Sequence, residues 1–195
     1  AENETKNVQT IIKKENGYIE FMIASKQGIE EADGDGQWML HAQGKVYQHE
    51  DEDPASQNLY ELLSRCDQKK VKVQMEGADG MFKFGPRWYS LKEVNYGENE
   101  FLAKVELAEE LRSDLEEFYL HPALLDNAIN ATMQDNDGIY LPLNYKSFKL
   151  FERTPAIFYS HIRKKENVSG SKETITYDVT LVDAQGKVIA EIFDY

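Results

Sequence analysis

One segment constrains the fold more than any other, because it combines apolarity with helical spacing. It covers residues 121–133 and reads "HPALLDNAINATM". Its apolar positions recur at the spacing of one helical face, and Pro122 suits the first turn of a helix. These positions are Leu124, Leu125, Ala128, Ile129 and Thr132 or Met133. A helix with such a face must be buried against another layer of the protein.

The sequence around this helix predicts β-strands. Strand-forming segments precede it at residues 70–75 and within 80–106, where a turn is expected near Gly97. Four more follow it at residues 139–151, 156–165, 174–183 and 187–195, and a turn at 184–186 joins the last two. Short strands, one apolar helix and four strands in succession predict an α+β layer, in which an antiparallel sheet wraps around a central helix.

The N-terminal part predicts strands without a comparable helix. Two β-rich runs within residues 7–25 are joined at Glu15-Asn16-Gly17, a hairpin signal, and a third run covers 37–48. We expect residues 1–48 to be the end of a similar layer whose beginning is missing. Residues 49–69 are expected to form a polar linker and a short helix, and 70–195 the second layer. Ser56 is expected to cap the short helix.

Composition narrows the possible partners. The chain has 35 acidic and 22 basic residues, which give a net charge of −13. A negative field disfavours nucleic acid and anionic membranes, and no run approaches the roughly 20 apolar residues of a membrane helix. One cysteine, Cys66, suits a reducing compartment. We therefore expect a cytoplasmic protein that binds no nucleic acid and no membrane, and the absence of metal-ligand spacing or a phosphate loop predicts no metal or bound cofactor.

Two features could serve a partner or a reaction. Arg163, Lys164 and Lys165 form a basic cluster, either a solvated face or a docking site for an acidic carrier. Asp126 and Asn130 lie four residues apart, so they share a helical face. The carboxylate could offset the helix dipole, or it could be an acid in an apolar pocket that donates a proton. Spacing alone favours the first role.

The helix segment "HPALLDNAIN" resembles the second signature of dehydratase domains from modular polyketide synthases, His-Pro-x-Leu-Leu-Asp. Residues 80–94 are similar to the family's Gly-x-x-Tyr-Gly-Pro-x-Phe segment, with Gly85 and Pro86 in place. Residues 38–46 resemble the last strand of the family's first hotdog, and residues 176–195 its closing hairpin. The resemblance implies a double hotdog fold whose first hotdog is incomplete in this chain.

The resemblance also implies a reaction. In the family an acyl chain, carried on the phosphopantetheine arm of an acyl carrier protein, enters a tunnel between the two hotdogs. A histidine from the first hotdog removes the α-proton, the counterpart of Asp126 protonates the departing β-hydroxyl, and the counterpart of Asn130 orients that acid. The expected partners are the carrier protein, neighbouring synthase domains and a second copy in a homodimer. The expected substrate-binding residues are Phe84, Gly85, Pro86, Trp88, His121, Pro122 and Leu125.

The base is not evident in this sequence. The family's His-x-x-x-Gly-x-x-x-x-Pro motif does not occur, and His41 and Gly44 have the wrong spacing for it. The positions of His49, His121 and His161 do not suit the base either. We therefore expect the chain to be a truncated piece that is inactive alone, with the catalytic histidine encoded upstream.

Two substitutions bear on the chemistry. Asn130 stands where the family has Gln or His, and Phe84 where it has Tyr. A shorter amide is expected to support Asp126 less well, which harms loss of the β-hydroxyl more than it harms proton shuttling. This slightly favours isomerisation of an α,β-enoyl to a β,γ-enoyl thioester over elimination of water. An ordinary 3-hydroxyacyl dehydratase, a pyran-forming cyclase, a catalytically silent domain and a hotdog thioesterase remain alternatives.

Overall fold

The computed structural model describes residues 6–26, 38–48, 53–73, 84–132, 141–166 and 174–195. The chain divides into two compact units, Ala1–Glu52 and Asp53–Tyr195. Each unit has its own sheet, so the two are described in turn.

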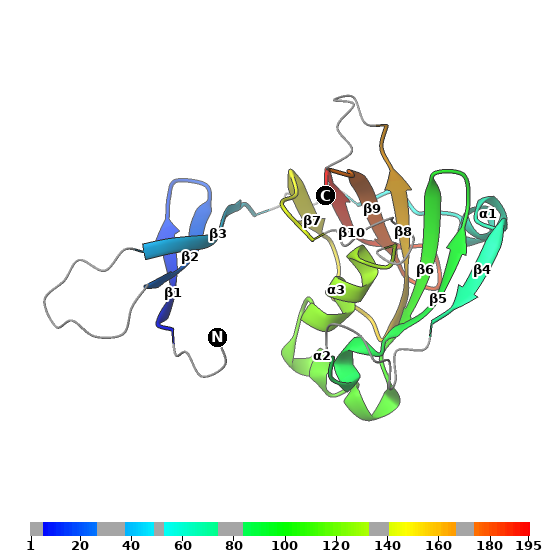
Figure 1. The fold of residues 1–195 in the computed structure, drawn as a ribbon, viewed down its shortest axis with the longest axis horizontal. Helices are drawn as coiled ribbons and strands as arrows, with labels where there is room; N and C mark the ends of the chain where they lie inside the picture. The colour runs from blue at the N-terminus through cyan, green and yellow to red at the C-terminus, as the bar shows by residue number, and fades with distance from the viewer. Residues whose placement is uncertain (1–5, 27–37, 49–52, 74–83, 133–140, 167–173) are drawn as a thin grey trace, which may run out of the picture. The chain divides into compact units, whose positions relative to one another are not determined.

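The N-terminal unit contains a three-stranded antiparallel sheet in the order β1-β2-β3 (Figure 1). Its strands are β1 (Val8–Lys14), β2 (Ile19–Lys26) and β3 (Trp38–Val46). The hairpin predicted at Glu15-Asn16-Gly17 is confirmed: Lys14 pairs with Ile19, and Gly17 has a φ of +90°, which favours glycine. Large apolar side chains lie on the surface of this unit, including Ile12 at 68% exposure.

The second unit contains a seven-stranded sheet in which every neighbouring pair is antiparallel. Its order is β4-β5-β6-β8-β9-β10-β7. The strands are β4 (Lys69–Lys72), β5 (Leu91–Tyr96), β6 (Glu100–Glu106), β7 (Ser147–Leu150), β8 (Ile157–Lys164), β9 (Tyr177–Val182) and β10 (Val188–Phe193). The four successive strands predicted after the helix are thus present as β7 to β10.

The first of those four strands is much shorter than predicted. The prediction covered residues 139–151, but β7 begins at Ser147, and Leu141 and Leu143 are 72% and 82% exposed. Pro142 lies between these two leucines and cannot donate a ladder hydrogen bond, which disfavours a strand there. Residues 139 and 140 lie outside the described part of the chain.

Helix α3 (Pro122–Ile129) packs against β5, β6 and β8 on one face of this sheet (Figure 1). Leu124 and Ala128 of the helix meet Phe158, Ile162 and Leu181 of the sheet in the main hydrophobic core. The α+β hotdog architecture, an antiparallel sheet wrapped around one central helix, is confirmed, with one hotdog-sized unit in the described residues.

The helix ends earlier than predicted. The apolar pattern extended it to residue 133, but Asn130 is its C-cap, with φ −101° and ψ 12°. Asparagine favours a helix end, because its side chain forms local hydrogen bonds that compete with the helical backbone. Ala131 and Thr132 are nevertheless buried. The apolar pattern therefore indicates burial of these residues, although the helix has already ended.

A shorter helix, α1 (Leu59–Arg65), packs on the other face of the sheet. Its buried Leu62 joins Cys66, Leu102 and Val182 in a second core, while Ala103 and Leu181, the neighbouring residues of those strands, face α3. The expectation that Ser56 caps α1 was wrong: Asn58 is the N-cap, and its side chain accepts hydrogen bonds from the amides of Tyr60 and Glu61 at 3.1 and 3.4 Å. Both residue types cap well, so composition alone did not separate them.

Three short helical turns precede α3 in the chain. They are the 3₁₀ helices η1 (Pro86–Trp88) and η2 (Glu109–Leu111), and α2 (Asp114–Glu117). Each is too short to show a periodic apolar face, which explains why the sequence did not predict them. Of these, η1 contacts α3 directly.

Candidate active site

The carboxyl group of Asp126 is held by two hydrogen bonds from neutral donors. Asp126 is half-buried on α3. Its Oδ1 accepts a hydrogen bond from Nδ2 of Asn130 at 2.8 Å, and its Oδ2 accepts one from the indole Nε1 of Trp88 at 2.7 Å. The shorter amide of Asn130 was expected to support Asp126 less well. The 2.8 Å distance does not bear this out, because it lies within the ordinary range of a hydrogen bond.

Asn130 is held in turn by Tyr195. The hydroxyl of Tyr195 donates to Oδ1 of Asn130 at 2.5 Å. Tyr195 follows β10 and exchanges two backbone hydrogen bonds with Tyr177 of β9, at 2.8 and 2.9 Å. Burial, and after it the charge of Asp126, raises the pKa of Tyr195. The phenol therefore keeps its proton at neutral pH and acts as a donor.

Trp88 is fixed through its backbone. The buried side chain of Asn127 on α3 donates to the carbonyl oxygen of Trp88 at 2.6 Å and to Oγ of Ser90 at 2.7 Å. Asn127 thus attaches η1 to the same helix that carries Asp126. This explains how a residue 38 positions earlier in the sequence reaches the carboxyl group.

A second set of contacts fixes the beginning of α3. His121 is the N-cap and is 1% exposed: its Nδ1 accepts a hydrogen bond from the amide of Leu124 at 3.3 Å, and its Nε2 lies 3.4 Å from Oδ2 of Asp114. Asp114 also forms a two-pronged ion pair with Arg87 of η1. The hydrogen bond from Arg87 lowers the pKa of Asp114. Both ring nitrogens of His121 are thus engaged within the protein.

The other residues expected at a substrate site fall into two groups. Phe84 stacks on Trp88 with the ring centres 6.2 Å apart, and Phe84, Gly85 and Pro86 are exposed. Pro122 is exposed at the first position of α3, while Leu125 packs against the main core. The structure therefore brings the Trp88 indole to Asp126, which Asn130 also contacts, and Phe84 stacks on Trp88. Asn127 and Tyr195 were not among the candidates.

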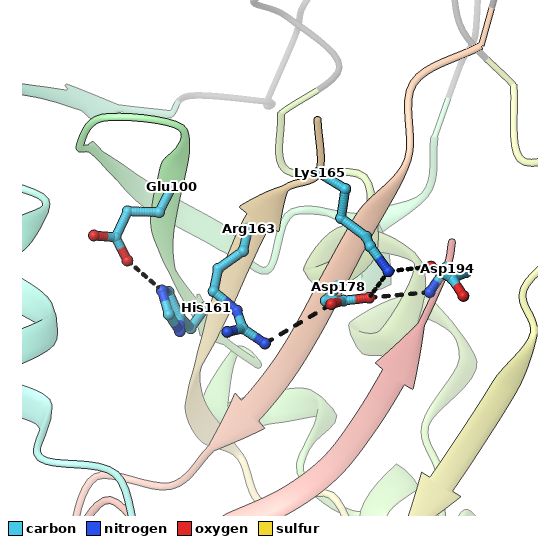
Figure 2. Close-up of polar contacts among 6 residues, drawn as sticks. All are labelled: Glu100, His161, Arg163, Lys165, Asp178 and Asp194. Carbon is cyan, nitrogen blue, oxygen red and sulfur yellow. Dashed lines mark hydrogen bonds and ion pairs between the residues drawn. The ribbon is translucent and has the colours of Figure 1, made fainter. Parts of the chain in front are cut away.

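The histidines of the described residues have partners away from Asp126. His161 lies on β8, and its Nε2 is 2.7 Å from Oε2 of Glu100 (Figure 2). Its neighbour Ser160 points to the other face, where it donates to the carbonyl oxygen of Ala128 on α3. His41 in the N-terminal unit lies 2.7 Å from Oγ of Ser25. His49 lies outside the described residues. The expectation of a base from elsewhere stays a prediction.

The basic cluster at the end of β8 is largely neutralised. Lys165 pairs with Asp194 and lies 3.7 Å from Asp178, and Arg163 lies 3.9 Å from Asp178 (Figure 2). Asp178 and Asp194 thus form ion pairs with Arg163 and Lys165, two of the three cations in the cluster. These contacts favour a solvated, ion-paired surface over a docking site for an acidic carrier.

Comparison with known proteins assigns the family. The family model described as "Polyketide synthase dehydratase N-terminal domain" matches residues 55–195. The chain belongs to the polyketide synthase dehydratase family. Among curated proteins, this dehydratase-family chain is 26% identical to the polyketide synthase PksM of Bacillus subtilis (strain 168), over 96% of the chain and 5% of PksM. It is 22% identical to PksN of the same organism, over 91% of the chain and 3% of PksN.

Solved structures show the same fold. The dehydratase domain from the CurF module of curacin polyketide synthase matches with a TM-score of 0.78 and 28% identity, over 100% of this chain and 69% of that one. A dehydratase domain of a trans-AT polyketide synthase from Brevibacillus brevis gives a TM-score of 0.79 and 21% identity, over 99% and 69%. A CurK dehydratase described as an inactive aspartate-to-asparagine mutant gives 0.74 and 26%, over 97% and 67%. The recognised family is thereby confirmed.

The described residues contain neither a metal-binding cluster nor a membrane-spanning helix. No group of three or more His, Cys, Asp or Glu side chains there is arranged to hold a metal ion. No helix in the same ranges is long and apolar enough to cross a membrane.

Proposed function

We propose that this chain carries the acid of a dehydratase domain that acts on acyl chains tethered to the phosphopantetheine arm of an acyl carrier protein. In the proposed reaction, a base removes the α-proton of a 3-hydroxyacyl thioester while Asp126 gives its proton to the β-hydroxyl. The carbon–oxygen bond breaks, water leaves and an α,β double bond forms. The carrier protein and the neighbouring synthase domains are the proposed partners.

The observation that carries this proposal is that two segments bind one carboxyl group directly and a third holds it through Asn130. Trp88 of η1, Asn130 after α3 and Tyr195 after β10 fix a half-buried aspartate in the position of the family's His-Pro-x-Leu-Leu-Asp signature. General acid catalysis needs a proton donor held in a defined orientation toward the reacting group. A carboxylate serving only the helix dipole needs no such support.

The same contacts bear on the choice between elimination and isomerisation. Isomerisation is favoured only if Asn130 supports Asp126 weakly, but the Asn130 amide lies 2.8 Å from the Asp126 carboxyl group. Elimination is therefore the first proposal. Isomerisation stays the second candidate, because both carboxyl oxygens already accept hydrogen bonds, from Trp88 and Asn130, and so have less capacity left for a β-hydroxyl.

The test is Asp126→Asn in the full-length protein that contains this chain, with a 3-hydroxyacyl thioester of the carrier protein as substrate. We expect water elimination and the reverse hydration to fall at least about 100-fold, the usual contribution of a general acid. Asp67→Asn, an exposed aspartate beside α1, is the control and should keep full activity. Undiminished turnover by Asp126→Asn contradicts the assigned role.

A second substrate separates the two candidate reactions. The unmodified protein is given an α,β-enoyl thioester in deuterated water. An isomerase produces the β,γ-enoyl thioester with deuterium at the α-carbon, whereas a dehydratase adds water and produces the 3-hydroxyacyl thioester. If neither product forms and no 3-hydroxyacyl substrate is consumed, the domain is catalytically silent.

A further inference from the structure

We propose that Trp88 and Tyr195 are positioning residues for Asp126: Trp88 holds one carboxyl oxygen directly, and Tyr195 holds the other through Asn130. The inference rests on the proposed function, because it assigns the side chains that aim the acid of that reaction. It gives Trp88 a positioning role in place of the expected substrate contact, and it adds Tyr195 to the site.

The carboxyl plane of Asp126 is fixed because its two oxygens have different donors. Trp88 binds Oδ2 and Asn130 binds Oδ1, at 2.7 and 2.8 Å. A carboxyl group held at one oxygen can still turn about its terminal torsion, which is broad in aspartate. Donors at both oxygens restrict that rotation, so a proton on the carboxyl group would point in a defined direction.

Tyr195 determines which end of the Asn130 amide faces the acid. The Tyr195 hydroxyl donates to Oδ1 of Asn130, so Nδ2 is the end that faces Asp126. Without that hydroxyl the amide could turn over and place its oxygen against the carboxylate, where two acceptors would oppose each other. Tyr195 is fixed by backbone hydrogen bonds to Tyr177 of β9. The sheet therefore determines the orientation of the Asn130 side-chain amide.

The Trp88 contact depends on the indole nitrogen. An indole carries one N–H donor and no acceptor, whereas a phenylalanine ring carries neither. Asn127 holds the carbonyl of Trp88 at 2.6 Å, so the indole is attached to α3. The Trp88 donor thus supplies support to Asp126 that a phenylalanine could not.

The experiment compares Tyr195→Phe and Trp88→Phe in the full-length protein, with kcat and KM measured for the 3-hydroxyacyl carrier thioester. Each substitution keeps an aromatic ring and removes the donor. We expect kcat to fall roughly 3- to 10-fold in each, the rate equivalent of one neutral hydrogen bond, with little change in KM. Tyr60→Phe, an exposed tyrosine on α1, is the matched control and should leave both constants unchanged. Thermal unfolding verifies that each variant is folded.

A double-mutant cycle distinguishes positioning from a general loss of packing. In an Asn130→Ala background, Tyr195→Phe should have no further effect on kcat, because its influence passes through Asn130, whereas Trp88→Phe should still lower it. Equal additional losses from both contradict the relay. If kcat stays within twofold in both single variants while Asp126→Asn is inactive, the inference fails and the proposed function stands. If Asp126→Asn is fully active, the proposed function itself fails.

Discussion

At the scale of single residues, His161 is a buried ionisable group outside the candidate site. It lies on the sheet face opposite α3, where Glu100 accepts hydrogen bonds from both His161 and Arg65. Burial lowers the pKa of His161, although the hydrogen bond to Glu100 opposes that shift. Burial also acts to raise the pKa of Glu100, but the hydrogen bonds from Arg65 and His161 outweigh it, so its pKa is lowered.

This arrangement predicts how stability depends on pH. Between pH 7.5 and 5.5 the unfolded chain binds a proton at His161 more readily than the folded protein does, because the folded pKa lies below the ordinary histidine value of 6.5. The His161 contribution is therefore fully present above about pH 6.5 and is lost as the pH falls toward the folded value. The pKa of Glu100 lies below the ordinary glutamate value of 4.5, outside this window.

We expect His161→Gln, which keeps a donor for Glu100, to reduce this dependence. The measurement is the free energy of unfolding of the second unit in urea at pH 7.5, 6.5 and 5.5. The loss of stability from pH 7.5 to 5.5 should be smaller in the variant than in the unmodified protein. Equal losses in the two proteins would show that His161 does not contribute to the pH dependence.

At the scale of elements, the sequence predicted what is periodic and missed what depends on single contacts. The α3 pattern gave the central helix, and the four-residue spacing gave the pairing of Asp126 with Asn130. Trp88 and Tyr195 lie 38 and 65 residues from their partners. No spacing rule connects residues so far apart, so these contacts emerge only from the folded sheet.

The corrected cap of α1 gives a prediction for this scale. Asn58 accepts hydrogen bonds from two free amides of the helix, and Ser56 is exposed outside it. Asn58→Ala should destabilise the second unit by about 1 kcal/mol, the usual cost of losing an N-cap. Ser56→Ala should change the free energy of unfolding in urea by less than about 0.5 kcal/mol. A larger loss of stability in Ser56→Ala than in Asn58→Ala would show that Ser56 is the N-cap.

At the scale of the whole molecule, the segment before α1 is joined to the distant turn between β9 and β10. The amide of Gln57 donates to the carbonyl oxygen of Gly186 at 2.8 Å. A Cβ added at Gly186 would lie 2.0 Å from the carbonyl oxygen of Gln57, and Gly186 has a φ of +86°. Only glycine fits this close approach without a shift of the backbone.

Gly186→Ala should therefore destabilise the second unit by more than about 1 kcal/mol, because it combines an unfavourable φ with a backbone clash. Gln185→Ala, an exposed position in the same turn, is the matched control and should stay within about 0.5 kcal/mol. The measurement is the urea midpoint and slope of the second unit. Equal midpoints for the two variants would mean that the α1 segment moves away freely.

The support of Asp126 consists of an indole, a carboxamide and a phenol, none of which is charged at neutral pH. Ionic strength screens charges and leaves such neutral contacts almost untouched, and the raised pKa of Tyr195 keeps its proton in place until strongly alkaline solution. The orientation that we propose for Asp126 should therefore not depend on the ionic strength of the buffer. A rate–pH curve recorded for this protein would consequently describe the reacting groups themselves and not the scaffold that holds them.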